Sequence, residues 1–288
     1  MRDIFLQHFL DPKQSREVRR HIYSYCQKYL DTACCRNKTG DEMDSIVLTE
    51  HRTVVEMSDE ECELYLGSMS GIPDRDRSLA ILPADFDVTS GHDISKFLRQ
   101  NSKLACRGKA LVDTCRAILN QKGNERTKII VFADGRIGAG AAARDFLCAE
   151  ADLGCTWLDS GDDVEEKNKK ISWYQSADVT AEDFARPRVL VLNFEHAAGL
   201  NLQTESNNLI LFSPLYVGEG GTSGDAVADA STELQAIGRV YRPGQSKQEV
   251  HVYRIEVRGQ KGEECLDGHL IRRNNDKDTV AMATNAAD

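Results

Sequence analysis

The sequence predicts an α/β fold in which helices cover both faces of a parallel sheet, behind a mostly helical N-terminal extension. Short apolar runs such as Ile129–Ala133 have the length and composition of buried strands, and segments with helical periodicity separate them. Strands that alternate with helices in this way favour a parallel sheet. The 288 residues, 41% of them hydrophobic and 28% charged, suffice for the core of one large domain or two small ones.

The first 45 residues are predicted to form a basic helical extension. Apolar side chains recur at helical spacing across residues 13–30, and residues 31–44 are polar and loop-like. Residues 1–40 contain eight Lys or Arg against four Asp or Glu. A solvated basic face on a packing helix and a DNA-binding face both fit this pattern, and the first is the commoner.

Residues 46–122 are predicted to lead into the α/β domain as a mostly helical segment. Ile46–Met57 is rich in β-branched residues and is predicted to be extended. Ser58 followed by Glu61 matches a helix N-cap with a glutamate at the third helical position, so a helix should run from there to about residue 69. The remainder is predicted to contain an acidic, turn-rich stretch over 71–91 and helices at 94–100 and 108–121.

The α/β domain is predicted over residues 123–273 and precedes a polar tail, 274–288, that is predicted to be disordered. An Ala-rich run and two amphipathic stretches indicate its helices. The strands are predicted at 129–133, 155–158, 189–192, 209–212 and 250–255. The helices between them are predicted at 139–151, 164–175 and 232–241.

Composition and charge limit the possible functions. The formal net charge is −10, which argues against a surface that binds nucleic acid over its whole extent but permits a local basic strip. Nine cysteines occur without a Cys-x-x-Cys pair, so reduced thiols are predicted rather than a zinc site. No apolar run approaches the ~20 residues of a membrane span, and the first residues lack the features of a signal peptide.

The stretch from Gln235 to Gln245, with the sequence Q-A-I-G-R-V-Y-R-P-G-Q, carries the strongest chemical signal. On the predicted helix, Gln235, Arg239 and Arg242 would lie on one face. Two guanidinium groups and an amide on one stripe can bind phosphate oxygens, because arginine donates parallel hydrogen bonds and stays charged. Gly238 would let another surface approach closely.

This string resembles helicase motif VI of superfamily 2, which has the pattern Q-x-x-G-R-x-x-R. Its extension to Arg-Pro-Gly-Gln, followed by the strand Val-His-Val-Tyr-Arg-Ile, resembles the Swi/Snf-type DNA translocases in particular. The resemblance covers residues 46–270. It implies a RecA-like C-terminal motor lobe, with residues 46–122 as the segment that joins this lobe to a first one.

Other parts of the chain match the same family in the expected order. They resemble the strand that opens the second lobe, the strand that ends in L-D-G, motif V, and the strand after motif V; these are Lys128–Phe132, Trp157–Gly161, Val189–Leu202 and Asn208–Pro214. Asn193–Ala198 departs from the family because it lacks the arginine of motif V, which puts DNA contacts by that motif in doubt. The Gly-rich stretch within residues 214–231 is longer than the family's linker and is predicted to be a flexible loop.

The resemblance also implies a mechanism. Arg239 and Arg242 would act as arginine fingers that stabilise charge on the γ-phosphoryl group of ATP. ATP and Mg²⁺ would be bound mainly by a first RecA-like lobe, in trans or in a longer gene product. The reason is that the 288 residues contain no Gly-x-x-x-x-Gly-Lys-Ser/Thr string and no Asp-Glu-x-His string. Further implied contacts are Gln235, Gly199 and Gly238 at the nucleotide, and Asn201 and Lys128 on the DNA backbone.

The implied partners are DNA and chromatin proteins, and the implied location is the nucleus of a eukaryotic cell, or otherwise the cytoplasm. The Arg-Pro-Gly-Gln extension favours DNA over RNA, although no residue is recognisable as a reader of a 2′-hydroxyl group. No membrane partner is expected.

Two alternatives stay open. Because the P-loop string is missing, the chain could be a catalytically silent binding or regulatory fragment of such a protein. The glycine cluster of Phe132–Gly140, which follows a strand and opens a helix, could instead hold a phosphate in a Rossmann-type enzyme, with Asp159 as the candidate for a ribose contact. Its G-x-x-G-x-G spacing departs from that fingerprint. His196 and His251 are predicted to be structural, since neither lies near a nucleophile in the predicted elements.

Overall fold

A computed structural model of the chain describes residues 46–68, 99–121, 127–175, 187–215 and 233–271, apart from 151, 160, 198, 199, 201 and 269. Several predicted segments lie outside the described residues. These are the basic extension 1–45, the turn-rich stretch 71–91, most of the helix 94–100, the loop 214–231 beyond residue 215, and the tail 274–288.

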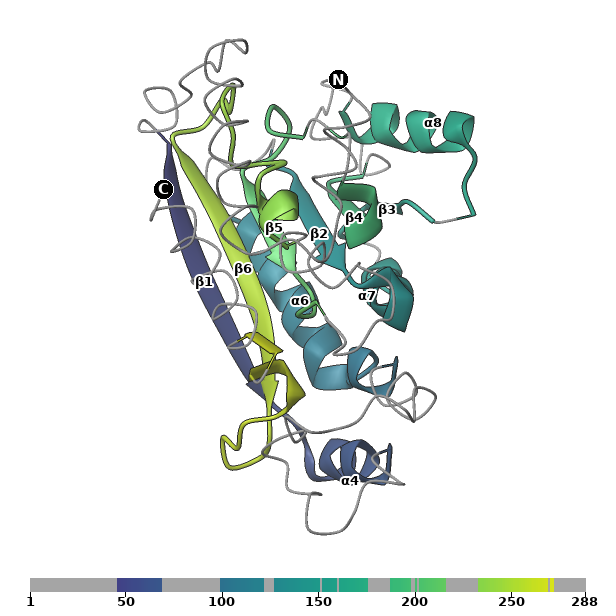
Figure 1. Cartoon of the computed structure of the whole chain (residues 1–288), viewed down its shortest axis with the longest axis vertical. Helices are drawn as coiled ribbons and strands as arrows, with labels where there is room; N and C mark the ends of the chain where they lie inside the picture. Colours follow the sequence, from purple (N-terminus) through teal and green to yellow (C-terminus); the bar gives the residue numbers. More distant parts are fainter. Residues whose placement is uncertain are drawn as a thin grey trace, which may run out of the picture. The chain divides into compact units, whose positions relative to one another are not determined.

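The described residues form one six-stranded sheet in which all neighbouring strands are parallel (Figure 1), as the alternating pattern predicts. The strand order is β1-β6-β5-β2-β4-β3. The strands are β1 (Val47–Glu56), β2 (Ile129–Ala133), β3 (Cys155–Trp157), β4 (Val189–Asn193), β5 (Asn208–Leu211) and β6 (Glu249–Arg258).

Burial follows the position of each strand in the sheet. Every residue of β2 and β5 is buried, because central strands of a parallel sheet are covered on both faces. In β1, at the edge, exposed side chains alternate with half-buried ones. Continuous apolar runs therefore mark the centre of the sheet, and the mixed polar sequence of β1 marks its edge.

The described helices are α4 (Asp59–Ser68), α6 (Ala105–Leu119), α7 (Ala139–Cys148) and α8 (Val164–Gln175), with short 3₁₀ turns η3 (Gly135–Ile137) and η4 (Phe194–Ala197). None of these described helices is both long and apolar enough to cross a membrane. Apolar side chains of α6 and α7 share a buried core with the central strands.

The predicted N-cap of α4 is confirmed. Ser58 N donates to Glu61 Oε2 at 2.9 Å, and Glu61 N donates to Ser58 Oγ at 3.2 Å. Glu61 Oε1 also accepts from Cys106 N at 2.8 Å, which joins α4 to the start of α6. Burial raises the pKa of Glu61, but the hydrogen bonds from Ser58 and Cys106 outweigh it and hold that pKa below its usual value.

Helix α6 begins three residues before its predicted start, and a buried ion pair explains why. Arg107, in its first turn, is completely buried, and its Nη2 donates to Asp267 Oδ2 at 2.6 Å. The same guanidinium donates to Phe212 O at 3.0 Å and to Asn101 O at 3.2 Å. The sequence does not mark Arg107 for burial, because two of its three hydrogen-bonding partners, Phe212 and Asp267, lie more than 100 residues away.

These contacts place the described parts of residues 46–122 in the same compact unit as the residues that follow. Strand β1 pairs with β6 along its whole length, and α6 contributes to the common core. The extended conformation predicted for Ile46–Met57 is thus confirmed, and β1 is a strand of the central sheet.

Candidate functional site

The segment 233–245 connects β5 to β6 and carries the predicted arginine fingers. Its residues 233–237 are helical and are followed by turns, so the helix predicted to extend to residue 241 ends earlier. Gly238 N still bonds Leu234 O at 2.8 Å, but Arg239 N and Val240 N bond the carbonyl groups three residues before them, at 3.1 and 3.0 Å. The prediction that Gln235, Arg239 and Arg242 lie on one face of an α-helix is therefore wrong. Hydrogen bonds to the carbonyl group three residues earlier wind the chain more tightly than an α-helix does.

Apolar side chains and an ion pair hold the amino end of the segment. Ala236, Ile237 and Val240 are buried against the sheet. Glu233 Oε1 accepts from Leu215 N at 2.8 Å, and its Oε2 accepts from Arg254 Nη1 of β6 at 2.6 Å. Sequence reasoning missed this pair, since nothing in the sequence connects two polar residues on different elements.

Gln245 holds the carboxyl end. Its Nε2 donates to Ser206 O and to Val240 O, both at 3.1 Å, and its Oε1 accepts from Lys247 N at 3.2 Å. All three of these hydrogen bonds of the Gln245 amide are made to backbone atoms of this chain. The last residue of the recognised string has a structural use here, as the tie between the arginine turn and the loop before β5.

Arg239 and Arg242 lie between these two attachments, and both are half-buried. Arg239 Nε is buried and has no hydrogen-bond acceptor among the described residues. A buried N–H group without an acceptor costs about 1–3 kcal/mol, so the Nε of Arg239 is a donor whose acceptor is missing among the described residues. Gln235 is exposed, and a Cβ on Gly238 would lie 3.2 Å from Leu234 O of its own turn, so glycine relieves crowding there.

The predicted DNA contacts have different outcomes. Gly199 and Asn201 lie outside the described residues. Lys128 is buried, its Nζ lies 2.8 Å from Glu205 Oε2, and it is placed over the Tyr174 ring at 5.2 Å. A phosphate contact would require that ion pair to break, so the structure gives Lys128 a part in the fold and we leave it out of the proposed DNA contacts.

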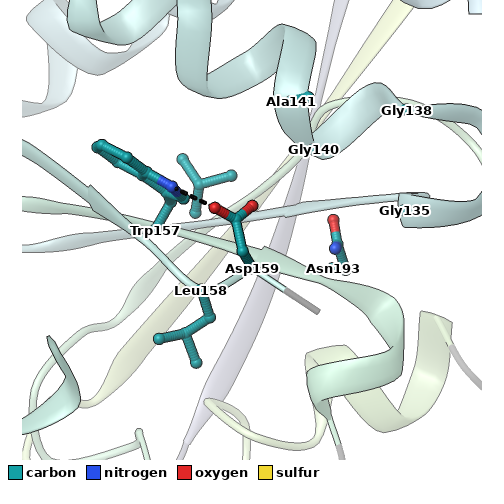
Figure 2. A pocket seen from close by; sticks show the side chains of 9 residues that line it. Gly135, Gly138, Gly140, Ala141, Trp157, Leu158, Asp159 and Asn193 are labelled. Carbon is teal, nitrogen blue, oxygen red and sulfur yellow. Dashed lines mark hydrogen bonds between the residues drawn. The ribbon is translucent and has the colours of Figure 1, made fainter. Parts of the chain in front are cut away.

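A pocket of about 130 Å³ opens at the carboxyl ends of β2, β3 and β4 (Figure 2). It is the place where the glycine cluster suggested a phosphate site, and its lining includes Asp159 and Asn193. Asp159 Oδ2 accepts from Trp157 Nε1 at 2.9 Å. The full lining is Gly135, Gly138, Gly140, Ala141, Trp157, Leu158, Asp159, Val191 and Asn193.

Asn193 explains two glycines of the cluster. A Cβ on Gly140 would lie 2.0 Å from Asn193 Oδ1, and a Cβ on Gly135 would lie 2.6 Å from Asn193 Cγ. Gly138 has a different reason, because it caps α7 with a left-handed φ of 74°. Sites for small molecules usually measure about 300–1,000 Å³, so the pocket is small for a dinucleotide, and the glycines are accounted for without one.

We expect Gly140→Ala to destabilise the protein by about 1–3 kcal/mol, because the new Cβ overlaps Asn193. An alanine in a helix normally stabilises by up to about 1 kcal/mol, so the expected sign is the reverse of the usual one. Urea unfolding measures the difference, with Gly161→Ala as the control because nothing lies within 4 Å of a Cβ there. A Gly140→Ala protein as stable as the parent would contradict this account of the glycines, and Asn193→Ser should restore the loss.

The two noted histidines, His196 and His251, are both partly buried. Burial, followed by the charge of Lys167, lowers the pKa of His196. His251 Nδ1 lies 3.2 Å from His51 Nε2, and burial and this neighbour lower its pKa also. Both therefore favour the neutral form at pH 7. Among the described residues, no group of three or more His, Cys, Asp or Glu side chains is placed to hold a metal ion.

Comparison with known proteins identifies the fold. No family model matches the chain, and no curated protein sequence does. The chain is similar to the Sulfolobus solfataricus SWI2/SNF2 ATPase core in complex with dsDNA, with a TM-score of 0.51 and 16% identity over 75% of this chain and 42% of that one. This similarity confirms the RecA-like fold class that the sequence resemblance implies.

Two further structures are less similar. The Sulfolobus solfataricus SWI2/SNF2 ATPase core domain has a TM-score of 0.48 and 16% identity, over 73% of this chain and 40% of that one. The C-terminal part of the Fun30 ATPase domain has a TM-score of 0.43 and 15% identity, over 74% of this chain and 85% of that one. These lower scores add no argument about the fold. The chain spans less than half the length of either Sulfolobus solfataricus core.

Proposed function

We propose that this chain acts as the second motor lobe of a Swi/Snf-type, ATP-dependent DNA translocase. In this proposal Arg239 and Arg242 reach the γ-phosphate of an ATP that a first RecA-like lobe binds together with Mg²⁺. The observation that carries it is the buried Nε of Arg239, which has no hydrogen-bond acceptor among the described residues and sits in a turn tied to β6 at one end and to the loop before β5 at the other. A charged donor held this way can stabilise a phosphoryl group without further reorganisation.

The other contacts of the proposed mechanism rest on the sequence resemblance. Gln235, which is exposed, would contact the nucleotide together with Gly199 and Gly238, and Asn201 would contact the DNA backbone. Contacts to the DNA would go mainly to phosphates, so binding should tolerate any sequence and weaken with salt. In a eukaryotic cell the protein would act in the nucleus, with chromatin proteins as partners.

ATP hydrolysis by the purified 288-residue chain tests the proposal, measured alone, with duplex DNA, and with DNA and a separately produced Swi/Snf first lobe. We expect turnover only in the presence of the first lobe. Turnover by the chain alone would contradict the division of the site between two lobes. No turnover in any mixture, together with retained DNA binding, would favour the second candidate, a silent binding fragment, which the missing P-loop string supports.

A further inference from the structure

Strand β1 is one of the two edge strands of this sheet. Strand β1 pairs with β6 over all ten of its residues, and it lies at one side of the sheet (Figure 1, purple). In the part of the chain that the structure describes, no strand pairs with its other edge. Such an edge exposes a row of N–H and C=O groups that can bind another strand.

The hydrogen bonds to β6 show which residues of β1 have backbone groups directed outwards. Val47 N bonds Gln248 O at 2.7 Å, and Met57 N bonds Arg258 O at 3.0 Å. The odd-numbered residues therefore face β6, and the backbone groups of the even-numbered residues face the open edge. The same even-numbered residues have exposed side chains, including Leu48 at 36% and Val54 at 43%.

These exposed residues are complementary to themselves in one antiparallel register. When two copies of β1 pair about His51, Glu50 of each copy lies opposite Arg52 of the other. In the same register Leu48 lies opposite Val54. Cross-strand pairs of opposite charge or of two apolar side chains stabilise a sheet, whereas like charges destabilise it. The neighbouring registers place Glu50 opposite itself or Arg52 opposite itself, so charge selects the register centred on His51.

Three features that often prevent pairing at an edge, namely proline, lysine and a β-bulge, are missing from β1. Residues 47–56 contain neither proline nor lysine, and their register with β6 is continuous, without a bulge. Glu50 and Arg52 form ion pairs with Arg254 and Glu256 of β6, yet each remains about half exposed, at 51% and 50%. Their charges are therefore still accessible to a second chain.

We propose that a second copy of this chain docks antiparallel on β1, which would join the two sheets about a twofold axis at His51. The partner is a second copy because the pattern complements itself, and a twofold axis needs only one such patch. This interface does not depend on the proposed motor function.

The test compares two double variants of the full chain that differ only at residue 48. In L48K/V54K, lysines face each other across the twofold axis, whereas in L48E/V54K each glutamate faces a lysine. Both leave Glu50 and Arg52 in place. Sedimentation velocity over a dilution series should show a concentration-dependent dimer for the parent and for L48E/V54K, and a dimer at least roughly tenfold weaker for L48K/V54K.

Circular dichroism and urea unfolding of the variants separate a lost interface from a lost fold. A parent chain that stays monomeric across the series would overturn the proposal. Equal dimerisation of the two folded variants would overturn it as well, because residue 48 would then not lie at the interface. If L48K/V54K fails to fold, the comparison of L48E/V54K with the parent still tests the proposal. A monomeric L48E/V54K beside a dimeric parent would contradict the predicted pairing.

Discussion

Replacing both Arg239 and Arg242 by alanine is expected to slow ATP hydrolysis by about 10³-fold or more, in a protein where this lobe is joined to a first lobe. The reason is that both guanidinium groups would oppose the charge that develops on the γ-phosphoryl group. Stability should not fall, because the buried anchors of the segment are Ala236, Ile237 and Val240, and because the change removes a buried Nε that has no acceptor among the described residues. Steady-state phosphate release measures the rate, and urea unfolding measures the stability.

A matched control and a conservative variant sharpen this test. Arg116→Ala removes an arginine that pairs with Glu150 and Asp152 on the surface, and its rate should equal that of the parent. Arg239→Lys keeps the charge but loses the planar fork, so its rate should fall between those of the parent and Arg239→Ala. If the double variant hydrolysed ATP at the parent rate, the arginines would not be the fingers.

Asp267→Ala is expected to lower the free energy of unfolding by about 3–5 kcal/mol, the usual cost of removing one partner of a buried ion pair. Asp267 accepts hydrogen bonds from Arg107 Nη2, from Val257 N at 2.9 Å and from Asn101 Nδ2 at 3.1 Å. The variant would leave the Arg107 charge in a site with no exposed surface. Urea or guanidinium unfolding followed by circular dichroism gives the difference.

Asp113→Ala is the matched control for this loss. It removes the same side chain from an ion pair with Lys109, but both partners are exposed, at 54% and 78%. Surface pairs at this helical spacing contribute about 0.3–0.5 kcal/mol. A loss for Asp267→Ala no larger than that of the control would show that Arg107 can reach solvent or another acceptor.

The regular elements were predictable because their signals are local. Helix α8 occupies the predicted residues, and strands β2, β4 and β5 lie within about one residue of prediction, whereas β6 ends three residues later than predicted. A buried parallel strand needs a continuous apolar run, and the capping box of α4 needs only two residues three apart. The early end of the helix at Ile237 was not predictable, because the turn after it depends on contacts with other elements, among them Gln245 with Ser206.

The site was predictable in residue type but not in environment. The sequence resemblance implied a phosphate contact for both Arg239 and Lys128, the first as an arginine finger within motif VI and the second as a contact to the DNA backbone. The fold separates them, because Glu205 neutralises Lys128 whereas Arg239 Nε has no acceptor among the described residues. In the same way, Gly135 and Gly140 suggested a phosphate cradle, and the structure fills that space with Asn193.

The sequence by itself determined the parallel α/β architecture and the string Gln235–Gln245, because periodicity, apolar runs and motif spacing are properties of neighbouring residues. Only the tertiary structure decided which charges are already paired, which glycines serve packing, and that β1 is the edge strand of the sheet in the described part of the chain. Those properties depend on residues distant in sequence, such as Arg107 and Asp267 or Thr53 and Ile255, whose contact is set by the packing of the whole domain.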